Sequence, residues 1–297
     1  TAWSVQAGLR YSTVGWLAGG HVVPRLRLSY DVTDDLSLTA TSGRYLQYVA
    51  DGAEGREVTI DEPTFLVDEP QRAWTTTAGW SWRPAPNIKI GGESYYRRFR
   101  RMRRFVRSSA VPYPTFLQAS GTAYGLDLFA RKRSGWLTGQ LSYSYVRTRF
   151  TMEGDTYPPD WSTPHTVKGL VGIWIGAHWQ VRVAGTWRSG LPYTPATGSF
   201  RSPVFDPDEL RERFIEGAKN SARLPAYTRL DLSLRRTYVA EHFKWTLYVQ
   251  ALNVLNRANA LRVETRELYT TQGKGTYTPG IEDSLPFVPS LGVEFQF

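Results

Sequence analysis

Three observations predict that this chain of 297 residues is all-β, a transmembrane antiparallel β-barrel of about twelve strands forming a single domain over residues 1–297. Apolar and polar residues alternate with a period of two in segment after segment. These segments run to about ten residues, the length of a strand that crosses a bilayer at a tilt. The connections between them alternate short and long, as periplasmic turns and extracellular loops do in outer-membrane barrels.

The alternation is clearest in the middle of the chain, where Leu141 and Tyr143 share one face and Gln140 and Ser142 the other. The predicted strands are 3–11, 25–32, 36–43, 73–83, 87–99, 121–132, 137–145, 165–176, 178–187, 226–236, 244–254 and 286–297. Their apolar faces carry Leu, Val, Trp and Tyr. Their other faces carry Arg, Asp, Gln, Lys and Ser, which is too polar a set for a dry core.

The connections predict how the strands stand in a membrane. The short ones are "TDD", "RPAPN", "RSG", "GAH" and "TYVAEHFK", and the long ones are 12–23, 44–72, 100–120, 150–164, 188–225 and 255–285. This parity places both termini on the short-turn, periplasmic side. Aromatic residues near the strand ends would form the interface girdles: Trp3, Tyr11, Tyr30, Trp82, Trp136, Tyr145, Trp187 and Trp245.

Composition excludes several alternatives. The chain has no cysteine, so disulfides and thiolate metal sites are excluded. No run of apolar residues approaches the roughly 18 that a spanning helix needs. The one segment with helical character is 206–219, which we expect to form a short helix inside a long outer loop.

Several segments carry a resemblance to a known family. They are "PRLRLSYDVTDDLSLTATSGRYLQ", "AYGLDLFARKRSGWLTGQLSYSYVRTRF", "PHTVKGLVGIWIGAHWQVRVAGTWRSGLPYTP", "LPAYTRLDLSLRRTY", "TLYVQALNVLNRANA" and the terminal "GVEFQF". In their order and spacing the chain resembles the C-terminal part of the barrel of TonB-dependent outer-membrane receptors. The most specific of them are "RSGLPYTP" and the pair "LPAYTRLDLSL" and "NVLNRANA".

The resemblance implies a barrel of about 22 strands with a plugged lumen, and uptake of siderophore-, vitamin- or oligosaccharide-type solutes. Plug domain and N-terminal strands are absent from this sequence, so the twelve strands would be about half of such a barrel. The chain is then part of a longer receptor, one half of a split barrel, or a smaller closed porin-like barrel. A structural half-barrel, a scaffold subunit of a multi-chain outer-membrane complex, is the alternative function.

The resemblance also implies the partners and the location of the chain. The chain should lie in the cell outer membrane, in contact with outer-membrane lipid and lipopolysaccharide. A plug-bearing or complementary barrel chain, or a missing N-terminal part of the same chain, would complete it. The barrel assembly machinery would insert it, and TonB would act only indirectly, through a plug. Nucleic acid is not expected, although the net charge is +9, because the basic residues fall on the predicted membrane rim.

One arginine-rich run, "YYRRFRRMRRFVR", straddles the outer end of a predicted strand. Its arginines are Arg97, Arg98, Arg100, Arg101, Arg103, Arg104 and Arg107. Guanidinium forks suit phosphates and carboxylates, so the run predicts a site for lipopolysaccharide headgroups or for an anionic ligand. A solvated basic rim that adds solubility is the alternative.

The final "SLGVEFQF" sets an apolar row against Gly, Glu and Gln. The row is Leu291, Val293, Phe295 and Phe297. The resemblance implies that this strand closes the barrel and carries the signal that the assembly machinery recognises. The alternative is an ordinary edge strand.

Catalysis, cofactors and metal binding are not expected. The four histidines lack metal-ligand spacing, and no Ser–His–Asp order, glycine-rich phosphate loop or carboxylate dyad stands out. The carboxylates on the polar faces either line a lumen that contacts solute or form ion-pair ladders: Glu93, Asp127, Asp231 and Glu294. Three asparagines, Asn253, Asn256 and Asn259, should shape a loop, because Asn tolerates left-handed backbone conformations.

Overall fold

The computed structural model describes residues 2–17, 19–51, 64–106, 115–203, 210–241, 243–264 and 280–296. It is all-β, and the described residues form strands and no helix. The chain divides into two compact units, Thr1–Pro159 and Asp160–Phe297. No helix among the described residues is long and apolar enough to cross a membrane.

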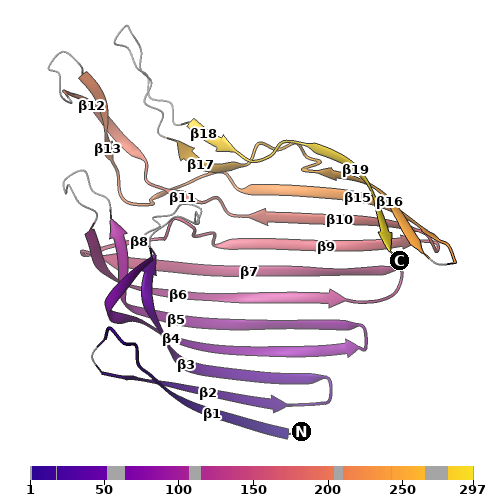
Figure 1. Ribbon diagram of the computed structural model, residues 1–297, viewed down its shortest axis with the longest axis horizontal. Helices are drawn as coiled ribbons and strands as arrows, with labels where there is room; N and C mark the ends of the chain where they lie inside the picture. Colours follow the sequence, from indigo (N-terminus) through magenta and orange to yellow (C-terminus); the bar gives the residue numbers. More distant parts are fainter. Residues whose placement is uncertain are drawn as a thin grey trace. The chain divides into compact units, whose positions relative to one another are not determined.

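The first unit is a meander of seven long antiparallel strands (Figure 1). These are β1 (Ala2–Ser12), β2 (His21–Asp31), β3 (Leu36–Asp51), β4 (Thr64–Ala85), β5 (Ile88–Val106), β6 (Thr115–Lys132) and β7 (Leu137–Met152). Each pairs with its neighbours in the sequence, and the short β8 (Asp155–Tyr157) folds back on the end of β7. Short turns join β2 to β3, β4 to β5 and β6 to β7 at one end of this sheet (Figure 1).

The second unit repeats the plan with five long antiparallel strands. These are β9 (His165–Ile175), β10 (Trp179–Arg188), β15 (Tyr227–Val239), β16 (Lys244–Leu252) and β19 (Val288–Gln296), hydrogen-bonded in that order. The long connections contain three small two-stranded ladders: β11 (Pro192–Tyr193) with β14 (Ala222–Arg223), β12 (Ala196–Pro203) with β13 (Leu210–Glu216), and β17 (Ala260–Glu264) with β18 (Gly280–Asp283).

The register confirms that each strand has one apolar and one polar face. Residues directly opposite one another in neighbouring strands share a face of the sheet. One apolar row of the second unit runs through Leu234, Val249 and Leu291. Leu291 is 70% exposed, and the apolar faces of both units expose many large hydrophobic side chains. We call the apolar faces the outward faces, and the polar faces the inward faces.

Stacked aromatic pairs lie on the outward faces beside the short turns. In the first unit Trp3 stacks on Tyr30, with ring centroids 4.3 Å apart. In the second, Tyr238 stacks on Trp245 at 4.0 Å. Each pair is directly opposite in the register, so the stack strengthens the pairing of its strands. The placement is that of an interface girdle.

All twelve predicted strands are confirmed, but their ends differ. The ends of β4 and β5 away from the short turns continue far into segments expected to be loop, so these strands have 22 and 19 residues. That is about twice the length needed to cross a bilayer. Cross-strand pairing sustains these extensions, since β3 and β4 pair again beyond a register shift after Gln47, up to Asp51 and Thr64.

The predicted helix over 206–219 is wrong where the structure describes it. Leu210–Glu216 is strand β13, paired with β12 in regular register from Leu210 to Ile215 and, beyond a register shift, at Glu216. An isolated helix of three or four turns is marginal in water, because its nucleation is costly. The hairpin instead satisfies the backbone groups of both segments together.

Candidate functional site

The inward face of the second unit is a polar wall crossed by ion pairs. Nε of Arg229 donates to Oδ1 of Asp231 over 2.8 Å. The backbone N–H of Asn253 donates to the same carboxylate oxygen over 2.8 Å. Asp231 therefore joins its own strand to the loop that follows β16.

A second ion pair spans three strands of this wall. Arg235 of β15 donates to Glu294 of β19 across the intervening β16. The guanidinium lies 5.3 Å from the ring centroid of Tyr248, the residue opposite Arg235 in β16. Gly292 is opposite Tyr248 on the other side, where an added Cβ would lie 2.4 Å from the tyrosine ring. Only glycine at position 292 avoids a clash with the Tyr248 ring, and that ring packs against the Arg235 guanidinium.

The carboxylates of the first unit are arranged differently. Glu93 of β5 lies directly opposite Asp127 of β6. Neither has an ion-pair partner within the described ranges. Two like charges in opposite positions destabilise a strand pair, so this part of the wall favours a cation beside it. The sequence left open whether these carboxylates brace the wall or face solute. The second unit shows bracing and the first unit does not.

The asparagine loop after β16 is built as expected. Asn253 and Asn256 have φ values of 51° and 44°, in the left-handed region that Asn tolerates. Asn253 is 2% exposed and its amide donates to the carbonyl oxygens of Arg257 and Leu285. Asn259 is 1% exposed, accepts from the Thr228 N–H at 2.7 Å and donates to the Thr228 carbonyl at 2.9 Å. Its side chain thereby extends the ladder at the start of β15.

A second loop junction in this unit centres on Arg223. Its guanidinium donates to the carbonyl oxygens of Ser162 at 2.7 Å and Gly190 at 2.9 Å. Burial lowers the pKa of this guanidinium from its ordinary value. A Cβ on Gly190 would lie 1.7 Å from the Leu224 carbonyl oxygen, so the close approach of the two segments requires glycine. The roots of these loops are thus fixed rather than free.

The arginine run divides between the two faces of β5. Arg97 lies on the inward face, where Nε donates to the hydroxyl of Thr75. Arg104 is also inward, with its guanidinium 5.5 Å from the ring centroid of Phe150. Arg98 and Arg100 lie opposite Trp74 and Arg72, on the outward face. Arg107 lies outside the described residues.

A bulge in β5 reverses which arginines of the run face outward and which face inward beyond Arg100. The register shifts between Phe99 and Met102, so two arginines, Arg100 and Arg101, occupy the space of one residue. Arg101 takes a left-handed conformation with φ of 57°. Beyond the bulge, Arg103 falls opposite Gln118, which shares the outward face. Sequence parity alone would have given the opposite faces beyond this point.

The histidines and the apolar row of β19 are the remaining candidates. The described ranges contain no group of three or more His, Asp or Glu side chains that could hold a metal ion. His21 packs edge-on against Tyr48, at 6.2 Å between ring centroids. Leu291, Val293 and Phe295 lie in one exposed outward row of β19, while Phe297 lies outside the described residues.

Comparison with protein families identifies this architecture. A family model described as TonB dependent receptor-like, beta-barrel, matches residues 1–254. The chain belongs to this family. The TonB-dependent receptor resemblance is therefore confirmed, as is the all-β antiparallel barrel fold.

Solved structures of outer-membrane proteins have the same fold. The ferric yersiniabactin uptake receptor FyuA from Yersinia pestis matches with a TM-score of 0.60 and 15% identity, over 93% of this chain and 37% of that one. The outer membrane transporter YddB from Escherichia coli matches with a TM-score of 0.64 and 12% identity, over 98% and 43%. The FrpB iron transporter from Neisseria meningitidis gives 0.61 and 14%, over 98% and 42%. No curated protein sequence matches significantly.

This TonB-dependent receptor-like chain spans less than half the length of each of these solved proteins. At these identities the likeness shows the fold. The match of the family model across both compact units agrees with the continuous series of alternating strands along the chain.

Proposed function

We propose that the chain forms part of the barrel wall of an outer-membrane receptor that takes up siderophore-, vitamin- or oligosaccharide-type solutes. The observation that carries this proposal is the match of the TonB-dependent receptor-like barrel over residues 1–254. In this proposal both units contribute strands to one barrel domain over residues 1–297.

The two faces of the strands support a position in the bilayer. Large apolar and aromatic side chains on the outward faces suit lipid, whereas the polar inward faces suit a wet lumen. The short turns would lie in the periplasm, with both termini, and the long connections would lie outside. Capture of a solute would then use the loops whose roots Arg223, Asn253 and Asn259 fix in place.

The edges of the sheet support a need for further strands. In the described pairings β1 is hydrogen-bonded to β2 alone, and β19 to β16 alone. An unpaired strand edge in hydrocarbon leaves backbone groups that cost several kcal/mol each. A complementary barrel segment, and a plug that couples to TonB, are the partners that this geometry and the family favour. The row formed by Leu291, Val293 and Phe295 is available to the barrel assembly machinery as its recognition strand.

A scaffold subunit of a multi-chain complex is the second candidate. The ion pair between Arg235 and Glu294 favours it, because that contact braces the wall from β15 to β19. Purification of the native complex in mild detergent, with identification of every chain, separates the two. A plug-bearing chain, or a plug in a longer form of this one, together with TonB-dependent solute uptake by cells, is expected of the receptor. Partners that lack a plug, and no uptake, would support the scaffold.

A further inference from the structure

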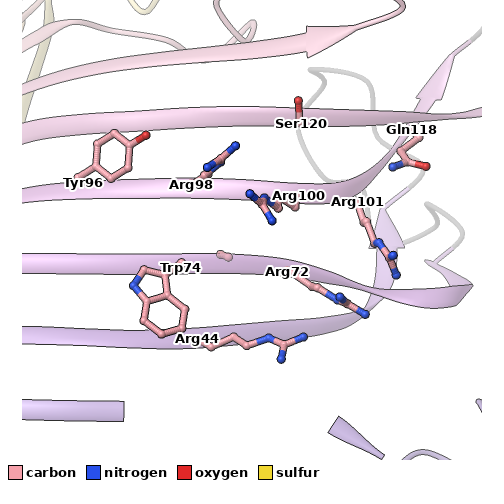
Figure 2. A pocket seen from close by; sticks show the side chains of 10 residues that line it. Arg44, Arg72, Trp74, Tyr96, Arg98, Arg100, Arg101, Gln118 and Ser120 are labelled. Atoms are coloured by element: carbon pink, nitrogen blue, oxygen red, sulfur yellow. The ribbon is translucent and has the colours of Figure 1, made fainter. Parts of the chain in front are cut away.

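We infer that the outward face of β3–β6 carries a binding site for the phosphates of a lipid headgroup, those of the lipopolysaccharide of the outer leaflet. The inference rests on the proposed function for the orientation of the strands. Its basis is a pocket on this face, about 740 Å³ in volume, lined by arginines from three neighbouring strands (Figure 2). Those arginines are Arg44 of β3, Arg72 of β4, and Arg98, Arg100 and Arg101 of β5.

The register assembles the pocket from distant parts of the sequence. Arg44 lies opposite Trp74, and Trp74 lies opposite Arg98, so the three form one row across β3, β4 and β5. Arg72 lies opposite Arg100 in the next row. Opposite residues share a face, and Figure 2 shows these guanidinium groups gathered along adjacent strands. The arginines of the β5 run are thus joined by two that are remote in the sequence.

The bulge in β5 adds a fifth arginine to the pocket. Without the extra residue, the position after Arg100 would alternate to the inward face. The left-handed φ of Arg101 lets its side chain line the pocket beside Arg100. A left-handed arginine is an uncommon conformation that costs free energy, and here it adds positive charge to a site that is already basic.

Within the part of the chain that the structure describes, little negative charge offsets the arginines of the pocket. Among the residues that the structure describes, no lining residue is a carboxylate, and one acidic partner lies nearby, Glu69, whose Oε2 is 2.5 Å from Nη1 of Arg101. That pair is half exposed, so it is readily exchanged. Within the described ranges Arg98 and Arg100 have no ion-pair partner. Nε of Arg72 is enclosed and has no hydrogen-bond acceptor. An anion with several acceptor oxygens would relieve this crowding of like charges.

The height of the pocket favours a lipid over a soluble anion. Trp82 and Trp74 both lie on the outward face of β4, eight residues apart, which is roughly 26 Å along a strand. A tilted strand of that length covers most of an apolar band about 25 Å tall. Arg72 and Arg100 come immediately beyond it, where headgroup phosphates lie. Two exposed arginines of β7, Arg147 and Arg149, are opposite Tyr124 and Thr122 and continue the basic band on the same face.

Native mass spectrometry of the intact receptor in detergent tests the site. The probes are bis-phosphorylated lipid A, the same lipid without phosphates, and inorganic phosphate. We expect the phosphorylated lipid to bind at least about tenfold better than the phosphate-free lipid, since charge-assisted hydrogen bonds supply the affinity. Inorganic phosphate at millimolar concentration should not displace it. Equal binding of the two lipids would overturn the inference, and so would displacement of bound lipid A by inorganic phosphate. Both results come from the unmodified protein.

A matched pair of variants locates the site. Arg98→Gln with Arg100→Gln should lower binding of phosphorylated lipid A at least about tenfold. Arg97→Gln with Arg104→Gln removes the same charge from the inward face of the same strand and should change binding less than about twofold. Equal losses in both pairs would overturn the assignment to the outward face.

Solute uptake should survive Arg98→Gln with Arg100→Gln. Absence of uptake in the unmodified protein would count against the proposed receptor, while the lipid result would still stand.

Discussion

Arg235 of β15 and Glu294 of β19 form an ion pair that passes over the ring of Tyr248 on the strand between them. The two residues are 59 positions apart in the sequence. The contact ties the last described strand to the polar wall and adds to the backbone ladder in setting its register. Asp231 has the corresponding role at the outer end of β15, through Arg229 and the loop after β16.

The two carboxylates should differ in their effect on stability. Asp231→Asn should lower the free energy of unfolding by about 1–3 kcal/mol, because a buried backbone N–H and a guanidinium lose a charged acceptor. Glu294→Gln should cost less than about 1 kcal/mol, because the Glu294 side chain is 63% exposed and its pair is screened by water. Thermal unfolding of the barrel in detergent measures both. Equal losses of unfolding free energy in the two variants would contradict the argument that the lower exposure of Asp231 makes its contacts more stabilising.

The asparagine loop should be sensitive to the side chain at Asn253. Asn253→Ala removes two hydrogen bonds to backbone carbonyls and places alanine at a φ of 51°. We expect a loss of roughly 3 kcal/mol in the free energy of unfolding. Asn256→Gly is the control, because glycine accepts the left-handed backbone and Asn256 is exposed, so its loss should stay below about 1 kcal/mol. A large loss in the control would instead assign the loop's stability to the exposed Asn256 contact with Phe287.

Gly190 should be irreplaceable even by alanine. A Cβ at this position would meet the backbone of Leu224, which cannot move without breaking the β11–β14 pairing. Gly190→Ala should therefore open the loop junction and speed amide hydrogen exchange at Leu224, whose N–H is bonded to the Leu191 carbonyl. Gly198→Ala is the matched control, since its Cβ would make an ordinary 3.6 Å contact with Ile215. Unchanged exchange in the Gly190 variant would contradict the close approach.

The strands were predictable because one face of the sheet meets lipid and the other meets water, so apolar and polar residues alternate along each strand with a period of two. Leu137 to Tyr145 shows this pattern without interruption, and β7 covers it. The segment 206–219 suggested a helix because Asp206 or Asp208 could cap its start and Gly217 could end it, whereas pairing with β12 decides the structure of 210–216. The partner strand β12 ends at Pro203, shortly before β13 begins at Leu210, and pairing with it overrides the local helix propensity.

The arginine site was predictable only in part. The run in β5 identified a basic rim, but the bulge at Arg100 and Arg101 inverts the faces of the residues beyond it. Arg44 and Arg72 were missed, because their place beside Arg98 and Arg100 depends on the β3–β4–β5 register. Arg44 and Arg72 both lie on the outward face, one residue beyond the predicted strands 36–43 and 73–83. Extending the alternation of those two strands by one residue could have found them.

Membrane orientation can be tested by labelling single cysteines in a chain that has none of its own. Asp155→Cys, in exposed β8 at the outer end of β7, should react with an impermeant maleimide on whole cells. Ser134→Cys, in the exposed β6–β7 turn, should react only after the outer membrane is permeabilised. The reverse pattern would invert the proposed topology.

The central claim is that alternate residues of each strand face lipid and lumen, and nitroxide labels on β15 test it most directly. Labels at Leu232→Cys and Leu234→Cys should be relaxed mainly by oxygen, which concentrates in lipid, and a label at Ser233→Cys mainly by a water-soluble nickel chelate. The account predicts this alternation in native outer membranes. The same relaxation at all three positions, or the opposite alternation, would contradict it.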